Sequence, residues 1–183
     1  MKRAIVTPAT VPTTALAELK QWLGITTTHD DAPLTALLHG ALDMCEAFTG
    51  QMPLAATCEE ILPASGGGWL SLATQPVRAI TTVQAVATDA TRTSLPSDGF
   101  ELDLAADGGG KLRLLRPAGG SRVAVRFTAG IAPDWTSLPP ALRQGILRFS
   151  AYQHRERDSD RATAQPPAAI AALWRPWRRM RLV

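Results

Sequence analysis

Apolar residues recur at helical spacing in the first fifty residues. One helix is predicted over about 14–23, with a stop at Gly24, and a second begins after Asp30 or Asp31 and ends at Gly50. The apolar face of the second helix consists of Leu34, Leu37, Leu38, Ala41, Cys45 and Phe48. Each helix therefore has a single apolar face that must pack against other elements.

The periodicity changes after about residue 55. Short apolar runs alternate with turn residues up to about 128, and Val123, Val125 and Phe127 show the clearest period of two. Glycine clusters such as residues 107–110 are typical of tight turns between strands. This part of the chain predicts a small antiparallel β subdomain.

Helical spacing returns beyond the loop that follows Gly130. A third helix is predicted from Pro139 or Pro140, and its apolar face consists of Leu142, Gly145, Ile146, Phe149 and Tyr152. A charged linker over 155–167 separates it from a last short helix at about 167–174. Gly130 and Pro133 turn the chain from the last strand back to the helices.

The element order predicts an α+β fold. Residues 1–54 and 132–183 would form a small α-helical bundle of two N-terminal and one or two C-terminal helices, with the antiparallel β subdomain, residues 55–131, inserted. Residues 1–12 show little periodicity and are expected to form an extended arm of the helical part.

Composition and charge add an asymmetry to this picture. The chain is 45% apolar, has no run of the roughly 18 residues needed to span a membrane, and starts without an apolar signal region, so folding in the cytoplasm is expected. Residues 1–140 carry a net charge of −3, whereas 141–183 carry +6, and all the basic residues of the latter are arginine. Arginine favours bidentate contacts with carboxylates and phosphates.

No metal or cofactor site is indicated by the residues that usually provide one. His29, His39 and His154 lack zinc-type spacing, and Cys45 and Cys58 are too few for a disulfide framework and are expected to be free. We therefore expect no metal and no cofactor.

Catalytic patterns are also missing. Residues 108–112 read Gly-Gly-Gly-Lys-Leu, but a leucine replaces the Ser/Thr of a phosphate loop, so a hairpin turn is favoured. Glu59 and Glu60 are adjacent, so in a strand their side chains would point apart. With no activated nucleophile visible either, the sequence argues against an enzyme.

Tryptophan is the more informative residue type. Trp22, Trp69 and Trp135 are expected to serve core or sheet packing. The C-terminal stretch is different because it interleaves Trp with Arg, and it comprises Trp174, Arg175, Trp177, Arg178, Arg179 and Arg181. It either folds onto its own bundle or anchors another protein, since Trp and Arg dominate interface energetics.

Five segments of the sequence, taken in their order along the chain, resemble a known family. They are LAELKQWLGITTTHDDAPLTALLHGALDMCEAFTG, LATQPVRAITTVQAV, FELDL, RVAVRFTAGIAPDWTSLPPALRQGILRFSAYQHRER and AALWRPWRRMRL. In this order they resemble the phage head–tail connector or adaptor family, with its gp6-like and phiE125 gp8-like members and the head–tail adaptors of gene transfer agents. Gly145 departs from this pattern, where alanine is usual.

The resemblance implies a structural role without catalysis. Such proteins form a ring, typically dodecameric, beneath the portal protein at the head–tail interface of a virion or phage-like particle made in the bacterial cytoplasm. The ring extends the DNA channel, through which DNA passes without sequence-specific binding, and it joins a stopper or tail-side connector. No membrane is involved.

Under this reading, the C-terminal residues Trp174 to Arg181 would dock on the portal. The alternative function is a basic nucleic-acid-binding module, in which arginine follows phosphates and tryptophan stacks on bases. The acidic first 140 residues and the absence of a reader motif argue against it.

Overall fold

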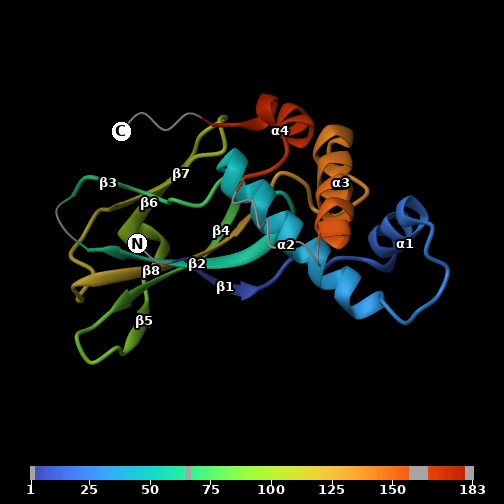
Figure 1. Ribbon diagram of the computed structural model, residues 1–183. Coiled ribbons are helices and arrows are strands. Elements are labelled where there is room, and N and C mark those ends of the chain that lie inside the picture. The colour runs from blue at the N-terminus through green and yellow to red at the C-terminus, as the bar shows by residue number, and fades with distance from the viewer. Residues whose placement is uncertain (1–2, 65–66, 157–164, 180–183) are drawn as a thin grey trace. The chain divides into compact units, whose positions relative to one another are not determined.

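The computed structural model describes residues 3–64, 67–156 and 165–179 and confirms an α+β fold. The chain divides into two compact units (Figure 1). A β unit comprises residues 1–9 and 55–130, and a helical unit comprises residues 10–54 and 131–183.

The β unit contains a five-stranded antiparallel sheet in the order β1-β2-β8-β4-β5. Its strands are β1 (Arg3–Thr7), β2 (Ala56–Pro63), β4 (Val77–Val86), β5 (Arg92–Ser94) and β8 (Arg122–Ala129). The central strand β8 buries Val123, Val125 and Phe127, as its alternation predicts. It also buries Ala124, a small side chain between its cross-strand neighbours Ile61 and Gln84, although Arg122 and Arg126 on the same face are exposed.

The N-terminal residues differ from the expectation of an arm on the helical part. Arg3–Thr7 pair with β2 in antiparallel register, with Ile5 opposite Cys58, and so form an edge of the large sheet. Short exposed strands of this kind take their conformation from the neighbouring ladder, and the low periodicity of residues 1–12 therefore concealed a strand.

A second, three-stranded sheet has the order β3-β7-β6. It comprises β3 (Trp69–Ser71), β6 (Phe100–Leu104), which follows the 3₁₀ turn η1 (Ser97–Gly99), and β7 (Gly110–Leu114). The predicted turn at 107–110 joins β6 to β7, and Gly108 takes a φ of 83° there. The phosphate-loop pattern is thus a hairpin turn.

The neighbouring acids of β2 point to opposite faces of the strand, as expected. Glu60 is fully buried and accepts hydrogen bonds from the backbone amides of Ala73 and Thr74, each at 2.9 Å, and from the Thr74 hydroxyl at 2.6 Å. Glu59 accepts a bidentate pair from Arg92 at 2.9 Å and a longer bond from Arg126 at 3.3 Å. Both carboxylates therefore hold the β unit together.

The helical unit contains α1 (Thr13–Leu23), α2 (Asp31–Thr49), α3 (Pro140–Glu156) and α4 (Ala168–Trp174), followed by the 3₁₀ turn η2 (Arg175–Trp177). Gly24 and Gly50 end the first two helices with a φ of 73°, as the sequence predicts. Between α2 and α3, the Ser150 hydroxyl lies 3.3 Å from the Leu37 carbonyl. No helix among the described residues is both long and apolar enough to cross a membrane.

The chain that re-enters the helical unit after the β unit is held by backbone hydrogen bonds. The amides of Ile131 and Ala132 donate to the carbonyls of Met52 and Pro53 at 2.9 and 3.1 Å. Trp135 is buried in this unit, as expected for a core tryptophan. The irregular joint before α3 is therefore a packed part of the bundle.

The Glu59 carboxylate provides a test of the β unit. Hydrogen bonds from Arg92 first, and then from Arg126, hold the pKa of Glu59 below its usual range. Its stabilising effect is fully present above the unfolded-state pKa of about 4.3 and is lost as the pH falls through the lower folded-state pKa. Glu59→Gln should reduce the free energy of unfolding at pH 7 by about 1–3 kcal/mol, with the difference shrinking below about pH 4. Urea unfolding at several pH values measures this.

The matched control is Glu101→Gln. Glu101 also pairs with an arginine, Arg113, at 2.6 Å, but both side chains are well exposed. An exposed pair contributes less than about 1 kcal/mol. An equal loss in the two variants would contradict the assigned role of Glu59.

Candidate partner-binding surface

The C-terminal stretch starts from a buried anchor. Trp174, the last residue of α4, is fully buried in the helical unit. Its ring centroid lies 6.0 Å from those of both Phe48 and Phe149, and its indole Nε1 donates to the Leu142 carbonyl at 3.4 Å. Trp174 therefore fills a pocket among α2, α3 and α4 of its own unit and does not present its ring to a partner.

Gly145 makes room for this ring. A Cβ atom on Gly145 would overlap the Trp174 indole at Nε1 and lie 2.8 Å from its Cδ1. The departure from alanine noted in the sequence thus has a packing reason: α4 approaches α3 closely at this point. The sequence contained a signal of this contact, because an isolated glycine inside a helical pattern usually has a packing or functional reason.

The residues after Trp174 lie alongside the C-terminal end of α2. The Arg179 amide donates to the Thr49 carbonyl at 2.9 Å, and the Gln51 side-chain amide donates to the Trp177 carbonyl. The Arg178 guanidinium lies 5.5 Å from the centre of the Phe48 ring. The segment up to Arg179 is thus fixed on the helical unit by backbone hydrogen bonds and by the contact of Arg178 with Phe48.

We call Arg175, Pro176, Trp177, Arg178 and Arg179 the tail surface. Arg175, Pro176 and Arg178 are exposed, and Trp177 and Arg179 are half-buried. The tail surface carries three arginines and no acid, next to an amphipathic ring. Arg181 lies outside the described residues. The sequence left two alternatives for this stretch, folding onto its own bundle or anchoring another protein. Trp174 follows the first, because it packs inside the bundle. A binding role of the other residues stays a prediction.

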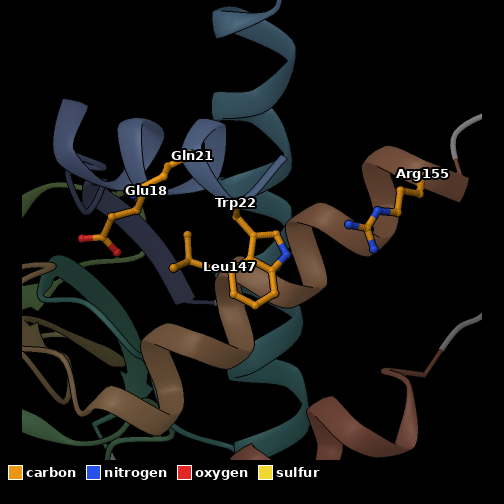
Figure 2. A pocket seen from close by; sticks show the side chains of 5 residues that line it. All are labelled: Glu18, Gln21, Trp22, Leu147 and Arg155. Carbon is orange, nitrogen blue, oxygen red and sulfur yellow. The ribbon is translucent and has the colours of Figure 1, made fainter. Parts of the chain in front are cut away.

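A second candidate surface was missed by the sequence analysis. Between α1 and α3 lies an open pocket of about 600 Å³ lined by Glu18, Gln21, Trp22, Leu147 and Arg155 (Figure 2). Trp22 is 45% exposed, so it is not the core residue expected. The position of Trp22 gave no signal of its exposure, because it lies seven residues after Ala15 and three after Leu19, on the same helical face as these two buried residues.

Arginine lies close to both exposed tryptophans. The Arg148 guanidinium lies 5.7 Å from the Trp22 ring centre, and the Arg113 guanidinium lies 5.2 Å from that of Trp69. Trp69 is 44% exposed on β3, where it forms part of a sheet face. Cation–π contacts of this kind keep a large ring ordered on a surface.

Metal-ligating side chains are not gathered in the described part of the chain. Among those residues, no three His, Cys, Asp or Glu side chains are placed to hold a metal ion. Cys45 and Cys58 are buried and form no disulfide, and burial raises the pKa of the Cys45 thiol to about 12. Such a thiol is protonated at neutral pH and behaves as a small apolar side chain.

Among known proteins, the chain is similar to chains in solved structures. No protein-family description matches the sequence, and none of the curated proteins matches it either. A chain from the neck of an empty gene transfer agent (GTA) particle, computed with C6 symmetry, is 27% identical with a TM-score of 0.80. This match covers 100% of the present chain and 98% of that chain.

Two further structures agree with this similarity. A chain from the virion of a native GTA particle is 29% identical with a TM-score of 0.77, and one from the neck of a native GTA particle, computed with C12 symmetry, is 29% identical with a TM-score of 0.76. Each match again covers 100% of this chain and 98% of the other. The whole chain, with both units, therefore has the architecture of GTA neck chains.

The close contact between Gly145 and Trp174 can be tested by a substitution that adds one methyl group to α3. Gly145→Ala should lower the free energy of unfolding by about 1–3 kcal/mol through overpacking, despite the better helix propensity of alanine. Gly40→Ala in α2 is the matched control, because its Cβ would meet only the Gln153 Oε1 at 4.0 Å. It should be neutral or stabilising by up to about 1 kcal/mol. Chemical denaturation compares them, and a stable Gly145→Ala protein would disprove the close contact.

Proposed function

We propose that the protein is a structural head–tail connector, or adaptor, of a gene transfer agent or phage-like particle. The observation that carries this proposal is the full-length similarity to GTA neck chains, with TM-scores of 0.76 to 0.80 at 27–29% identity. The match covers 100% of this chain and 98% of the neck chain, so both units have a counterpart in it. The protein joins capsid to tail and catalyses no reaction.

The role requires several copies around the axis of the particle. The necks that contain similar chains were computed with C6 and C12 symmetry, which supports a ring of copies of the present chain. Cyclic rings need a heterologous contact, in which one face of each subunit meets a different face of its neighbour. Such a ring extends the channel for DNA between the portal protein and a tail-side connector.

The tail surface is proposed to dock on the portal. Trp174 holds α4 in the helical core, and the hydrogen bonds to Thr49 and Gln51 place the following residues. Arg175, Trp177 and Arg178 are then presented with limited loss of conformational freedom on binding, which favours affinity. Arginine would pair with acidic groups of the partner, and the uncovered part of Trp177 would enter an apolar pocket.

The docking role predicts a binding defect without unfolding. The triple variant Arg175→Ala, Trp177→Ala, Arg178→Ala should reduce the amount of protein retained on purified particles about tenfold or more, as expected when interface hot spots are removed. Its unfolding free energy should fall by no more than about 2 kcal/mol, because only the half-buried part of Trp177 and the Arg178–Phe48 contact are lost and the buried Trp174 is kept. Quantitative immunoblotting of particles and urea unfolding measure the two effects.

Trp69→Ala with Arg113→Ala is the matched control, since it removes another exposed Trp–Arg contact from the β unit. It should leave particle occupancy at the wild-type level. Wild-type occupancy of the tail variant would contradict portal docking. Sub-micromolar, salt-sensitive DNA binding by the free protein, lost in the tail variant, would instead support a nucleic-acid-binding role.

A further inference from the structure

The pocket between α1 and α3 has the composition of an interface anchor. Trp22 leaves nearly half of its surface uncovered, Leu147 is buried beside it, and Arg155 lines the same opening (Figure 2). Arg148 is exposed and lies 5.7 Å from the Trp22 ring centre. A large aromatic ring next to arginines is the typical centre of a protein interface. The acid that lines the pocket, Glu18, lies 3.9 Å from Arg143, so Arg148 and Arg155 still favour an acidic partner.

Helix α2 offers a surface with the complementary charge. Residues 31–49 contain Asp31, Asp43 and Glu46 but no lysine or arginine, whereas α3 contains three arginines and one glutamate. The Lys20 ammonium pairs with Asp31 at 2.6 Å, and the other two acids lie along the middle and end of the helix. The exposed stripe of α2 is formed by Ala32, Ala36, His39, Asp43 and Ala47. Its three alanines have small side chains against which a flat ring can lie, and Asp43 is its exposed acid.

These two surfaces belong to different sides of the helical unit. The stripe lies about half a turn around α2 from its buried residues Leu34, Leu38 and Cys45, which face the core. On α3, Ser150 approaches α2 at Leu37, while Arg148 and Arg155 are exposed and lie nearly half a turn around the helix from Ser150. One subunit can therefore use both surfaces at once, as a heterologous contact requires.

We propose that the pocket between α1 and α3 of one copy receives the exposed stripe of α2 of a second copy. Trp22 lies on the alanines of the neighbour, and Arg148 and Arg155 face the exposed acid of the stripe, Asp43. This inference rests on the proposed function, because a ring requires such a contact to repeat around an axis. The inference specifies which two faces meet in the proposed ring. A two-fold dimer would bring identical faces together, so this contact between different faces does not form one.

Cysteine cross-linking tests which faces meet. Gln21→Cys places a thiol at the exposed edge of the pocket, and Ala36→Cys or Ala47→Cys places one on the stripe. The native Cys45 and Cys58 are buried and should not react under folding conditions. A short bismaleimide added to purified particles, and to the concentrated full-length protein, should give a ladder of dimers, trimers and larger species with Gln21→Cys plus Ala36→Cys or Ala47→Cys.

Matched controls separate this contact from random collision. Each single-cysteine variant should give no species beyond a dimer, because a heterologous contact does not bring two identical positions together. Gln21→Cys with Ala169→Cys, an exposed position on α4, should give no ladder. A ladder that is equally strong in this control, or no ladder with either stripe position in both particles and concentrated protein, would overturn the proposal.

Charge reversal provides a second test. It is introduced into the double-cysteine variants, which carry Gln21→Cys together with Ala36→Cys or Ala47→Cys. Arg148→Glu or Asp43→Arg alone should reduce the ladder about tenfold, because like charges then face each other. A mixture of the two variants should restore it, because the reversed pocket of one variant can face the reversed stripe of the other, and the two unaltered surfaces can face each other. Failure of the mixture to exceed either variant alone would contradict the assigned pairing.

The two proposals fail in distinguishable ways. Absence of the protein from particles together with a ladder in concentrated protein would reject the connector function and keep the contact between copies. Protein that is present in particles but gives no ladder in either preparation would keep the connector function and reject this pair of faces.

Discussion

The packing of Trp174 into the space left by Gly145 is the interaction on which the C-terminal part of the protein depends. Helix α4 has only seven residues and cannot be stable alone. Its position is set by the indole ring, which contacts Phe48 and Phe149 and donates to the Leu142 carbonyl. A glycine in α3 lowers helix propensity, but the absence of its Cβ lets the two helices approach and the ring be buried.

The burial of Trp174 gives two neighbouring tryptophans, Trp174 and Trp177, different roles that the sequence alone did not distinguish. Trp174 stabilises the bundle, whereas Trp177 remains half-buried in a segment fixed by backbone hydrogen bonds at the end of α2. The exposed arginines on either side of Trp177 are thereby placed on a surface while their charges stay in water. A proposed docking segment that is already ordered loses less entropy when it binds, which fits a permanent structural joint.

The proposed assembly follows from how charge is distributed in the helical unit. Acids are concentrated on α2 and arginines on α3 and the tail surface, so the unit has surfaces of opposite sign. In the proposed ring, copies of the unit would attract each other through these different faces, as a closed heterologous assembly requires. The similarity to chains in necks of C6 and C12 symmetry supports the same organisation.

The sequence alone determined the α+β class, the helices ending at Gly24 and Gly50, the strand around Val125 and the opposed directions of Glu59 and Glu60, because each depends on local periodicity or turn chemistry. Only the tertiary structure decided that residues 3–7 join the β unit, that Trp174 is buried, and that Trp22 is exposed in a pocket. These outcomes depend on partners far apart in the chain, such as Gly145 for Trp174 or Arg148 for Trp22. Periodicity reports which face of an element is apolar, but not which distant element covers it.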